Sequence, residues 1–221
     1  MNAEKQSGPA RESKTDQAYR LLEEKIVTMA LAPGMLVSEA EVALELGLGR
    51  TPVREALQRL AVEHLVEIMP RRGIRVAEIN VAKQLRLLEV RRVLETLAVG
   101  LAARRASPAV RADFAELAER METAGSDSDY LAFLRLDRDF DALVLDAAGN
   151  EFTAAILQQL HGLSRRFWHH YYRREEDLQL VTRLHSAIAR AVSAGDEAAA
   201  VSAASAHMDY IYSFTRAVLE Y

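Results

Sequence analysis

The feature that most constrains the fold is the stretch from Ser38 to Val76, where two short helical patterns flank a glycine turn and a hairpin follows. Ser38 and Glu41 have the spacing of a capping box, so each side chain can bind a free amide at the start of a helix. Gly47 can adopt the left-handed conformation that ends that helix. The turn to Gly49 is so short that a second helix must follow at a steep angle. This order predicts a helix-turn-helix.

The second helix of this pair is predicted to start near Thr51, with Pro52 in its first turn, where the missing amide is harmless. Its apolar residues recur at the spacing of a buried face, and arginines lie one turn apart on the opposite face. An exposed guanidinium can pair with guanine edges in the major groove or with phosphate. A hydroxyl near the positive end of the helix dipole can donate to phosphate. The candidate DNA-reading residues of this helix are therefore Arg50, Thr51, Arg54 and Gln58.

A basic hairpin is predicted after this helix. Two short alternating runs, 66–69 and 74–76, surround a turn that contains proline and glycine, which is typical of a hairpin. Its tip would form a wing beside the DNA, with Arg71, Arg72 and Gly73 as the candidate contacts. The ordered set indicates a winged helix-turn-helix that binds DNA. The simpler alternative is a small helix-hairpin unit whose arginines are only solvated.

The charge distribution favours a specific DNA site over general nucleic-acid binding. The chain of 221 residues carries a formal charge of −4, yet residues 50–75 contain six arginines and three glutamates. The positive charge is thus concentrated on the predicted reading helix and wing, and affinity should fall steeply with salt. The chain has no cysteine, which excludes disulfides and thiolate metal sites. With neither a signal peptide nor a long apolar run in view, we expect a cytoplasmic protein without membrane contact.

The chain is predicted to be mainly α, with an N-terminal winged helix-turn-helix and a C-terminal antiparallel all-α bundle of about six helices. We expect a disordered tail over 1–12, the DNA-binding domain over 13–78, and a helical domain for effector binding and dimerisation over 79–221. A domain of that size is large enough to enclose a pocket. The expected helices of the bundle are 81–106, 108–124, 128–148, 151–174, 177–194 and 197–219.

Four ionisable residues of the helical domain fall where apolar core residues are expected. Asp137 and Asp141 lie one turn apart on one helix, and His185 and His207 lie on two others. Buried carboxylates are costly unless they are compensated, and two neighbours raise the pKa of one of them. The imidazoles could compensate them as ion pairs or share a divalent cation with them, namely zinc, nickel or manganese. The alternatives are ordinary core histidines and two aspartates that face a wet groove.

A run of basic and aromatic residues, 165–174, has the composition of a surface that binds single-stranded nucleic acid. An ordinary apolar stripe passes through it, and three acidic residues follow it. We therefore interpret the run as one wall of a pocket together with a solvated face, and keep nucleic-acid binding as the alternative.

The residues from Pro33 to Val76 resemble the N-terminal domain of GntR-family bacterial transcription regulators. The resemblance rests on the runs Arg50-Thr51-Pro52-Val53-Arg54-Glu55-Ala56-Leu57 and Arg71-Arg72-Gly73. Three positions depart from the family pattern. Gly49 stands where serine is frequent, Ala40 where fatty-acid-responsive relatives carry a DNA-contacting arginine, and His64 where glycine is usual.

The residues from Asn80 to Tyr221 resemble the all-helical ligand-binding FCD domain of the FadR subfamily. Six helices suggest its shorter branch, which includes vanillate-responsive regulators. The resemblance rests on Arg91-x-x-x-Glu95, Asp137-x-x-Phe140, Ala147-Ala148-Gly149-Asn150, His185, Gly195-Asp196 and His207.

The resemblance implies a divalent metal held by one aspartate and three histidines. Carried over, the ligands are Asp137, His185, His207 and Asp141, which stands where histidine is normal. It also implies that Arg91 faces the cavity and clamps an effector carboxylate with two hydrogen bonds. Asn150 would either line the pocket or cap a helix, and capping is the commoner role.

The predicted function is sequence-specific regulation of transcription and not catalysis. We expect a homodimeric repressor on a palindromic operator of double-stranded DNA, released by a small organic acid in a metal-containing pocket. In one alternative the divalent cation is itself the signal. In a remote alternative the helical domain is a metalloenzyme with a DNA-binding appendage.

Overall fold

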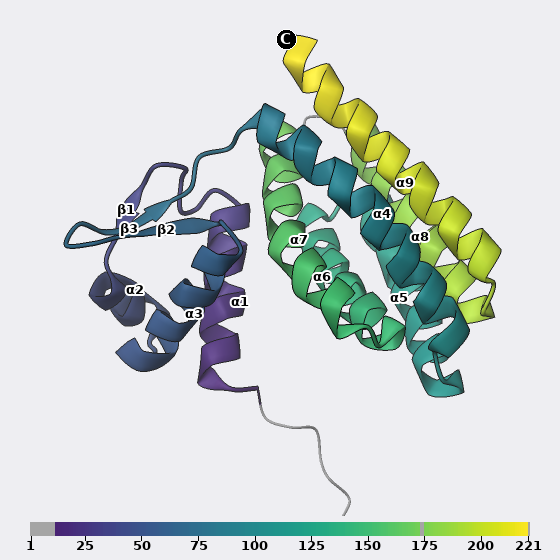
Figure 1. Ribbon diagram of the computed structural model, residues 1–221, viewed down its shortest axis with the longest axis horizontal. Helices are drawn as coiled ribbons and strands as arrows, with labels where there is room; N and C mark the ends of the chain where they lie inside the picture. Colours follow the sequence, from purple (N-terminus) through teal and green to yellow (C-terminus); the bar gives the residue numbers. More distant parts are fainter. Residues whose placement is uncertain (1–11, 173–174, 221) are drawn as a thin grey trace, which may run out of the picture. The chain divides into compact units, whose positions relative to one another are not determined.

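The structure, a computed structural model, describes residues 12–172 and 175–220 (Figure 1). It divides into two compact units, Met1–Glu78 and Ile79–Tyr221, and each is described by itself. The described residues form mainly α-helices, with one small three-stranded sheet in the first unit. The predicted fold class is thereby confirmed. Apart from Glu12, the predicted N-terminal tail lies outside the described residues.

The described part of the first unit, residues 12–78, is a three-helix winged domain. Its helices and strands are α1 (Lys14–Val27), β1 (Leu36–Val37), α2 (Glu39–Leu46), α3 (Arg50–Val62), β2 (Val66–Met69) and β3 (Gly73–Val76). Both neighbouring strand pairs are antiparallel, in the order β1-β3-β2. The sequence did not predict β1, because two residues are too few to show an alternating pattern. The strand exists because it pairs with the inner edge of the hairpin.

Local capping fixes the helix-turn-helix as the sequence predicts. The Ser38 hydroxyl accepts a hydrogen bond from the Glu41 amide, and the Glu41 carboxylate accepts one from the Ser38 amide. Gly47 ends α2 with a φ of 64°. His64 has a φ of 59°, a left-handed value that glycine adopts without steric cost. This conformation explains physically why glycine suits position 64.

The described residues of the second unit form a bundle of six α-helices, with a short 3-10 turn after the last. They are α4 (Val81–Arg105), α5 (Pro108–Ser126), α6 (Tyr130–Ala148), α7 (Glu151–Tyr171), α8 (Glu175–Ala194), α9 (Glu197–Ala217) and η1 (Val218–Glu220). The expected helices agree within three residues at each end. Residues 173–174, the expected end of the fourth helix, lie outside the described residues.

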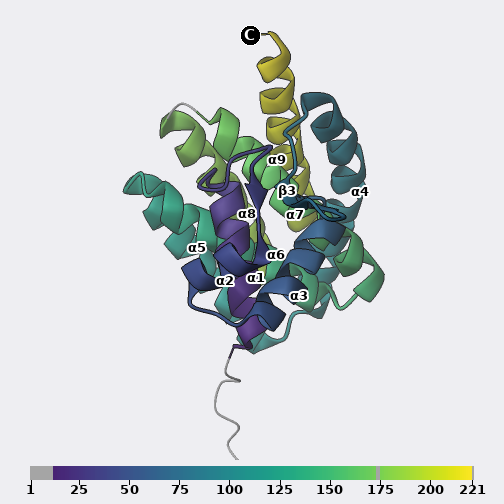
Figure 2. The ribbon, with the colours of Figure 1, turned by 90° about the vertical axis from the view of Figure 1, so that its left-hand side faces the viewer.

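The bundle is held together by close helix pairs. The helices α4 and α9 run side by side, and α5 packs along α8 (Figures 1 and 2). At Gly125 of α5 an added Cβ would lie 2.3 Å from Oγ1 of Thr182 of α8, so these two backbones approach closely because glycine is present. The core between the helices includes Phe114, Met121, Phe140, Leu157 and Met208.

Candidate functional sites

The helix α3 presents a polar face to solvent and buries an apolar one. Arg50, Thr51, Arg54 and Gln58 are exposed. The opposite residues Val53, Ala56, Leu57 and Leu60 are buried, and the helix packs against α1 (Figure 2). All four candidate DNA-reading side chains thus share one exposed face. The first amides of α3 remain open to an anion, since Gly49 offers no side-chain cap.

Half of the arginines between positions 50 and 75 are held by acidic neighbours. Arg54 binds Glu39 through Nε and Nη2, each 2.9 Å from Oε2, and this hydrogen bond with its charge raises the pKa of Arg54. Arg59 contacts Asp16 and Glu63 and lies 3.7 Å above the Tyr19 ring. Arg75 binds Glu67. The remaining arginines, Arg50, Arg71 and Arg72, form no ion pair with any described residue.

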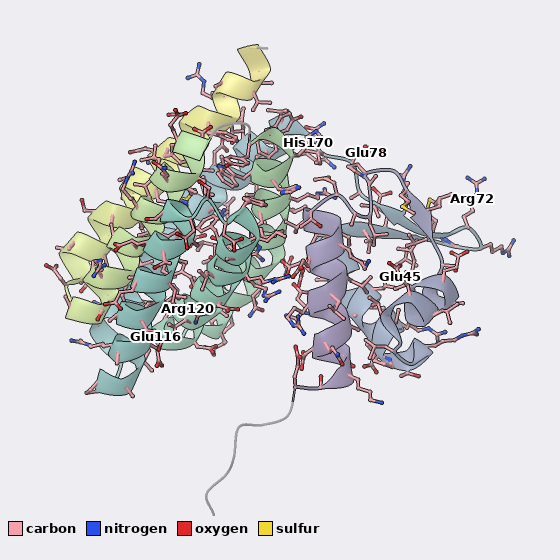
Figure 3. The ribbon with its side chains drawn as sticks, turned by 180° about the vertical axis from the view of Figure 1, so that it is seen from behind. Glu45, Arg72, Glu78, Glu116, Arg120 and His170 are labelled. Carbon is pink, nitrogen blue, oxygen red and sulfur yellow. The ribbon has the colours of Figure 1, made fainter. Side chains whose placement is uncertain are left out.

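The wing tip is a tight turn with strained backbone. The Arg72 amide donates to the Met69 carbonyl at 3.1 Å, and Arg71 has a φ of 64°. Proline followed by a residue of positive φ matches a type II turn, in which the third residue is normally glycine. Gly73 has a φ of 96°, and a Cβ there would lie 3.1 Å from the Val37 carbonyl oxygen. Arg72 extends from the end of the hairpin (Figure 3).

A cavity of about 40 Å³ lies inside the second unit. It brings together Arg91 of α4 and the four residues predicted as metal ligands. Because residues of α7 also line the cavity, side chains from five helices meet there: α4, α6, α7, α8 and α9. Its polar lining consists of Arg91, Asp137, Asp141, His161, Ser164, Arg165, His185 and His207. Asn150 is not among the lining residues, because its Oδ1 caps α7 by accepting from the amides of Phe152 and Thr153.

A continuous series of polar contacts begins at Arg91. Its Nε and Nη2 donate to Oε1 of Glu95 at 2.8 and 2.6 Å. The same oxygen lies 2.9 Å from Nε2 of His161, whose Nδ1 lies 3.2 Å from Oδ2 of Asp141. The pair formed by the buried Arg91 and the half-buried Glu95 is therefore linked to the aspartates through His161.

The series continues through Arg165 to His185. Nη1 of Arg165 lies 2.5 Å from Oδ2 of Asp141 and 3.5 Å from Oδ2 of Asp137. Oδ1 of Asp137 lies 2.9 Å from Nε2 of His185. The ring of His207 lies 4.2 Å from that of His185, but its buried Nε2 has no hydrogen-bond partner among the described residues. Nε2 of His207 is therefore a buried polar atom of the lining that lacks a hydrogen-bond partner among the described residues.

The two aspartates respond to this environment in opposite directions. Burial alone would raise the pKa of Asp137, but the hydrogen bond and charge of His185, with Arg165 and Arg91, hold it below its usual range. Burial and the neighbouring carboxylates Asp137 and Glu95 raise the pKa of Asp141 to about 6, against His161 and Arg165. Two carboxylates one turn apart thus differ in pKa, as mutual repulsion requires.

The histidines also differ from each other. Burial disfavours a charged His185, but the hydrogen bond to Asp137, the charges of Asp137 and Asp141 and the hydrogen bond to the Val181 carbonyl together raise its pKa. Burial, then the charges of His185 and Arg91, keep the pKa of His207 well below its usual value. His207 is therefore neutral, and its free nitrogen can accept or donate a hydrogen bond to a ligand.

The donor atoms, as arranged here, do not fit a metal ion. Within residues 12–172 and 175–220, no group of three or more histidine, aspartate or glutamate side chains is placed to hold one. Arg165 lies against both carboxylates, and His185 donates to Asp137. The divalent cation implied by the resemblance stays a prediction.

Three members of the polar centre were not singled out from the sequence. His161 and Arg165 lie one turn apart on α7, and the sequence analysis names Glu95 only within the family pattern Arg91-x-x-x-Glu95. The interpretation of 165–174 as a pocket wall is consistent with Arg165, which lines the cavity. A signal was available, because His161 follows Leu157 at one turn and precedes Trp168 at two turns, so it shares the buried face.

A winged helix-turn-helix joined to a helical unit with a polar cavity is the layout of a DNA-binding regulator. The model for "Bacterial regulatory proteins, gntR family" matches residues 14–76, and the model for the FCD domain matches residues 86–210. The FCD match alone covers more than half of the chain. The chain belongs to the FCD-domain regulators of the GntR family. It is a transcription regulator with a helix-turn-helix DNA-binding domain, and not an enzyme.

Individual relatives agree with this assignment. The chain is 27% identical over 221 residues to the HTH-type transcriptional repressor RspR of Escherichia coli, covering 99% of this chain and 95% of that protein. It is 32% identical over 146 residues to an HTH-type regulator of Streptomyces ambofaciens, a match that covers 65% of this chain and 61% of that protein. The solved structure of E. coli McbR/YncC superposes with a TM-score of 0.78 at 22% identity, over 95% of this chain and 100% of that one, which shows the shared fold.

Among the described residues, no helix combines the length and apolar character needed to cross a membrane.

Proposed function

We propose that this regulator is a repressor that a small organic acid releases from its operator. The observation that carries the proposal is the polar cavity, lined by a guanidinium that is only 8% exposed. A domain that merely joined two DNA-binding heads would gain nothing from buried charges. Arginine is the side chain best suited to a carboxylate, because it offers two parallel hydrogen bonds. The similarity to a relative named as a repressor extends over almost the full chain, which favours repression over activation.

On DNA, the exposed face of α3 would enter the major groove, with Arg50 and Arg54 near base edges and Thr51 at a phosphate. Arg71 and Arg72 of the wing would contact the flanking backbone. A homodimer in the cytoplasm would present two such heads to a palindromic operator. Its half-sites would lie about 34–36 Å apart, or one helical turn.

Release would depend on a second arrangement of the helical unit. The cavity of about 40 Å³ is far smaller than the roughly 300 Å³ or more of a typical metabolite pocket. Arg91 is also already bound to Glu95. An organic acid must therefore open the cavity and exchange for an internal carboxylate. If the opened arrangement holds the heads in a spacing that does not fit the operator, binding of the acid shifts the population away from DNA.

The test is fluorescence anisotropy of the full chain on duplexes from its own promoter region, over a salt series, with and without small carboxylates. We expect site-specific binding that weakens with salt and is reversed by one of the acids. Arg91→Gln should retain operator binding and lose the response. Light scattering should give a dimer. The proposal fails if no promoter duplex is preferred over a scrambled one.

A second candidate is a metal sensor, and the unpaired Nε2 of His207 beside His185 is the observation that favours it. In that case zinc, nickel or manganese would itself change operator affinity. Titration of each ion into the protein–operator complex separates the two functions. An operator affinity that no ion alters would eliminate the sensor.

A further inference from the structure

The feature that the proposed function does not explain is the position of Arg165. Its Nη1 lies against both Asp141 and Asp137, at 2.5 and 3.5 Å. The guanidinium comes from α7, whereas both carboxylates belong to α6. Its side chain is only 11% exposed, so this placement is internal to the bundle. A permanent positive charge thus lies on the two carboxylates that were predicted to hold a cation.

The acidic groups of the centre are compensated by side chains of the chain itself. Glu95 contacts Arg91 and His161, Asp141 contacts His161 and Arg165, and Asp137 contacts Arg165 and His185. Each of the three carboxylates therefore has two partners that carry or can carry positive charge. Buried carboxylates need such partners, and here the need is met without an ion.

A divalent cation would compete directly with Arg165. Metal–oxygen bonds to carboxylates are about 2.0–2.2 Å long, so an ion bound by Asp137 and Asp141 would share the space of the guanidinium. Oδ2 of Asp141 already lies within hydrogen-bond distance of both Arg165 and His161. Like charges a few Å apart in a buried site repel strongly. A cation can therefore enter only if Arg165 leaves.

We propose that Arg165 is the resident cation of this centre and that the helical unit works without a divalent metal. The inference rests on the proposed function only in taking the cavity as the effector site. An entering carboxylate would then be recognised by guanidinium groups, since Arg91 and Arg165 both line the cavity. It would exchange with Glu95 or Asp141 as the arginine's partner. Metal coordination would play no part in holding it.

The experiment measures metal binding by the full chain without DNA or effector. The protein is stripped with chelator, dialysed, and titrated with Zn²⁺, Ni²⁺ and Mn²⁺ in a calorimeter, and its metal content is determined by mass spectrometry. Arg165→Gln removes the guanidinium charge and keeps a hydrogen-bonding side chain. Arg190→Gln is the matched control, because Arg190 pairs with Glu122 on the exposed surface of the same unit. We expect the wild type and the control to bind no stoichiometric ion and Arg165→Gln to bind one.

Two further variants separate charge from folding. Arg165→Lys keeps the positive charge and should remain metal-free. The double variant Arg165→Gln with Asp141→His removes the guanidinium together with its nearest carboxylate partner and adds an imidazole beside Asp137, so it should gain an ion even if Arg165→Gln alone does not fold. Circular dichroism confirms the helical content of each variant. About one tightly held ion per wild-type chain overturns the proposal. So does a folded Arg165→Gln, alone or combined with Asp141→His, that stays metal-free.

The outcomes are distinguishable from those of the proposed function. Absence of operator binding would refute the repressor and leave the metal measurements intact. A stoichiometric metal in the wild type would refute the role of Arg165 and leave the repressor standing.

Discussion

Glu39 holds Arg54, one of the arginines predicted to read base edges, through two contacts of 2.9 Å. DNA must therefore exchange this carboxylate for a base or phosphate. Glu39→Gln should free the guanidinium and strengthen binding to random duplex DNA more than binding to the operator. The slope of log affinity against log salt should steepen by up to about 0.9, one phosphate contact. Anisotropy on operator and scrambled duplexes measures both.

The matched control for Glu39 is Glu45→Gln. It removes the same charge from the same helix but releases Lys25, which is not among the predicted DNA contacts. An equal gain in both variants would mean that only the net charge changed and that Glu39 does not govern Arg54.

His64 occupies a left-handed backbone position with an exposed side chain. A Cβ in that conformation costs the folded state about 1–2 kcal/mol. Glycine avoids this cost but loses more conformational entropy on folding, which offsets part of the gain. His64→Gly should therefore raise stability by roughly 0.5–1 kcal/mol, measured by thermal unfolding. His64→Ala keeps the Cβ and should show no such gain. Equal stabilisation by alanine would attribute the effect to the imidazole instead.

The hairpin formed by β2 and β3 combines a strained turn with two arginines that form no ion pair with any described residue. Arg71 has positive φ in a turn position that favours glycine. Arg71→Gly should leave the fold as stable or more stable and weaken DNA binding, because a phosphate-directed charge is lost. Arg72→Ala, which has no positive φ to relieve, should weaken binding without stabilisation. If Arg71→Gly lowers the unfolding temperature, the strain argument for this turn is wrong.

The close packing of helices α5 and α8 depends on the absence of a side chain at Gly125. The Cβ of Gly125→Ala would lie 2.3 Å from Oγ1 of Thr182, whose side chain is buried. Overpacking of this kind costs about 1–3 kcal/mol, and denaturant unfolding should show a loss in that range. The double variant Gly125→Ala with Thr182→Ala should recover part of it by removing Oγ1, the atom nearest to the new Cβ. No loss in the single variant would show that the helices separate easily.

Much of this architecture follows from short-range patterns in the sequence. Ser38, Glu41 and Gly47 act on their immediate neighbours, so their spacing was enough to place α2 and the turn. Apolar periodicity placed the six helices of the bundle and marked Asp137, His185 and His207 as residues on buried faces. The two-residue strand β1 depends on pairing with a distant segment, which periodicity does not report.

The arrangement of the polar centre could not be obtained in this way. Which partner a buried carboxylate takes depends on the rotation and approach of separate helices. Arg165 of α7 reaches Asp141 of α6, and His161 connects Asp141 to Glu95 of α4. The positions of polar residues on the apolar faces of the helices predict that these side chains are buried together. They do not predict that an arginine contacts both aspartates.

Considered over the full chain, the electrostatics predict modest binding to random DNA. The formal charge is −4, and only Arg50, Arg71 and Arg72 among the six arginines of 50–75 lack an ion pair with described residues. Three phosphate contacts per chain correspond to a slope of log affinity against log salt of roughly −2.7. Anisotropy on a scrambled duplex at several salt concentrations measures it. A slope twice as steep would require further basic contacts.

The small cavity also sets a limit on how fast the regulator can respond. About 40 Å³ is room for a few water molecules at most, and charged contacts connect four of the five helices that form its walls. A metabolite cannot simply diffuse in, so it must wait for those contacts to open. Its association rate should level off at high concentration, at the opening rate of the bundle. If the regulator is the proposed metabolite-released repressor, the opening rate of the bundle would set the shortest delay between a rise in metabolite and derepression, however much metabolite the cell supplies.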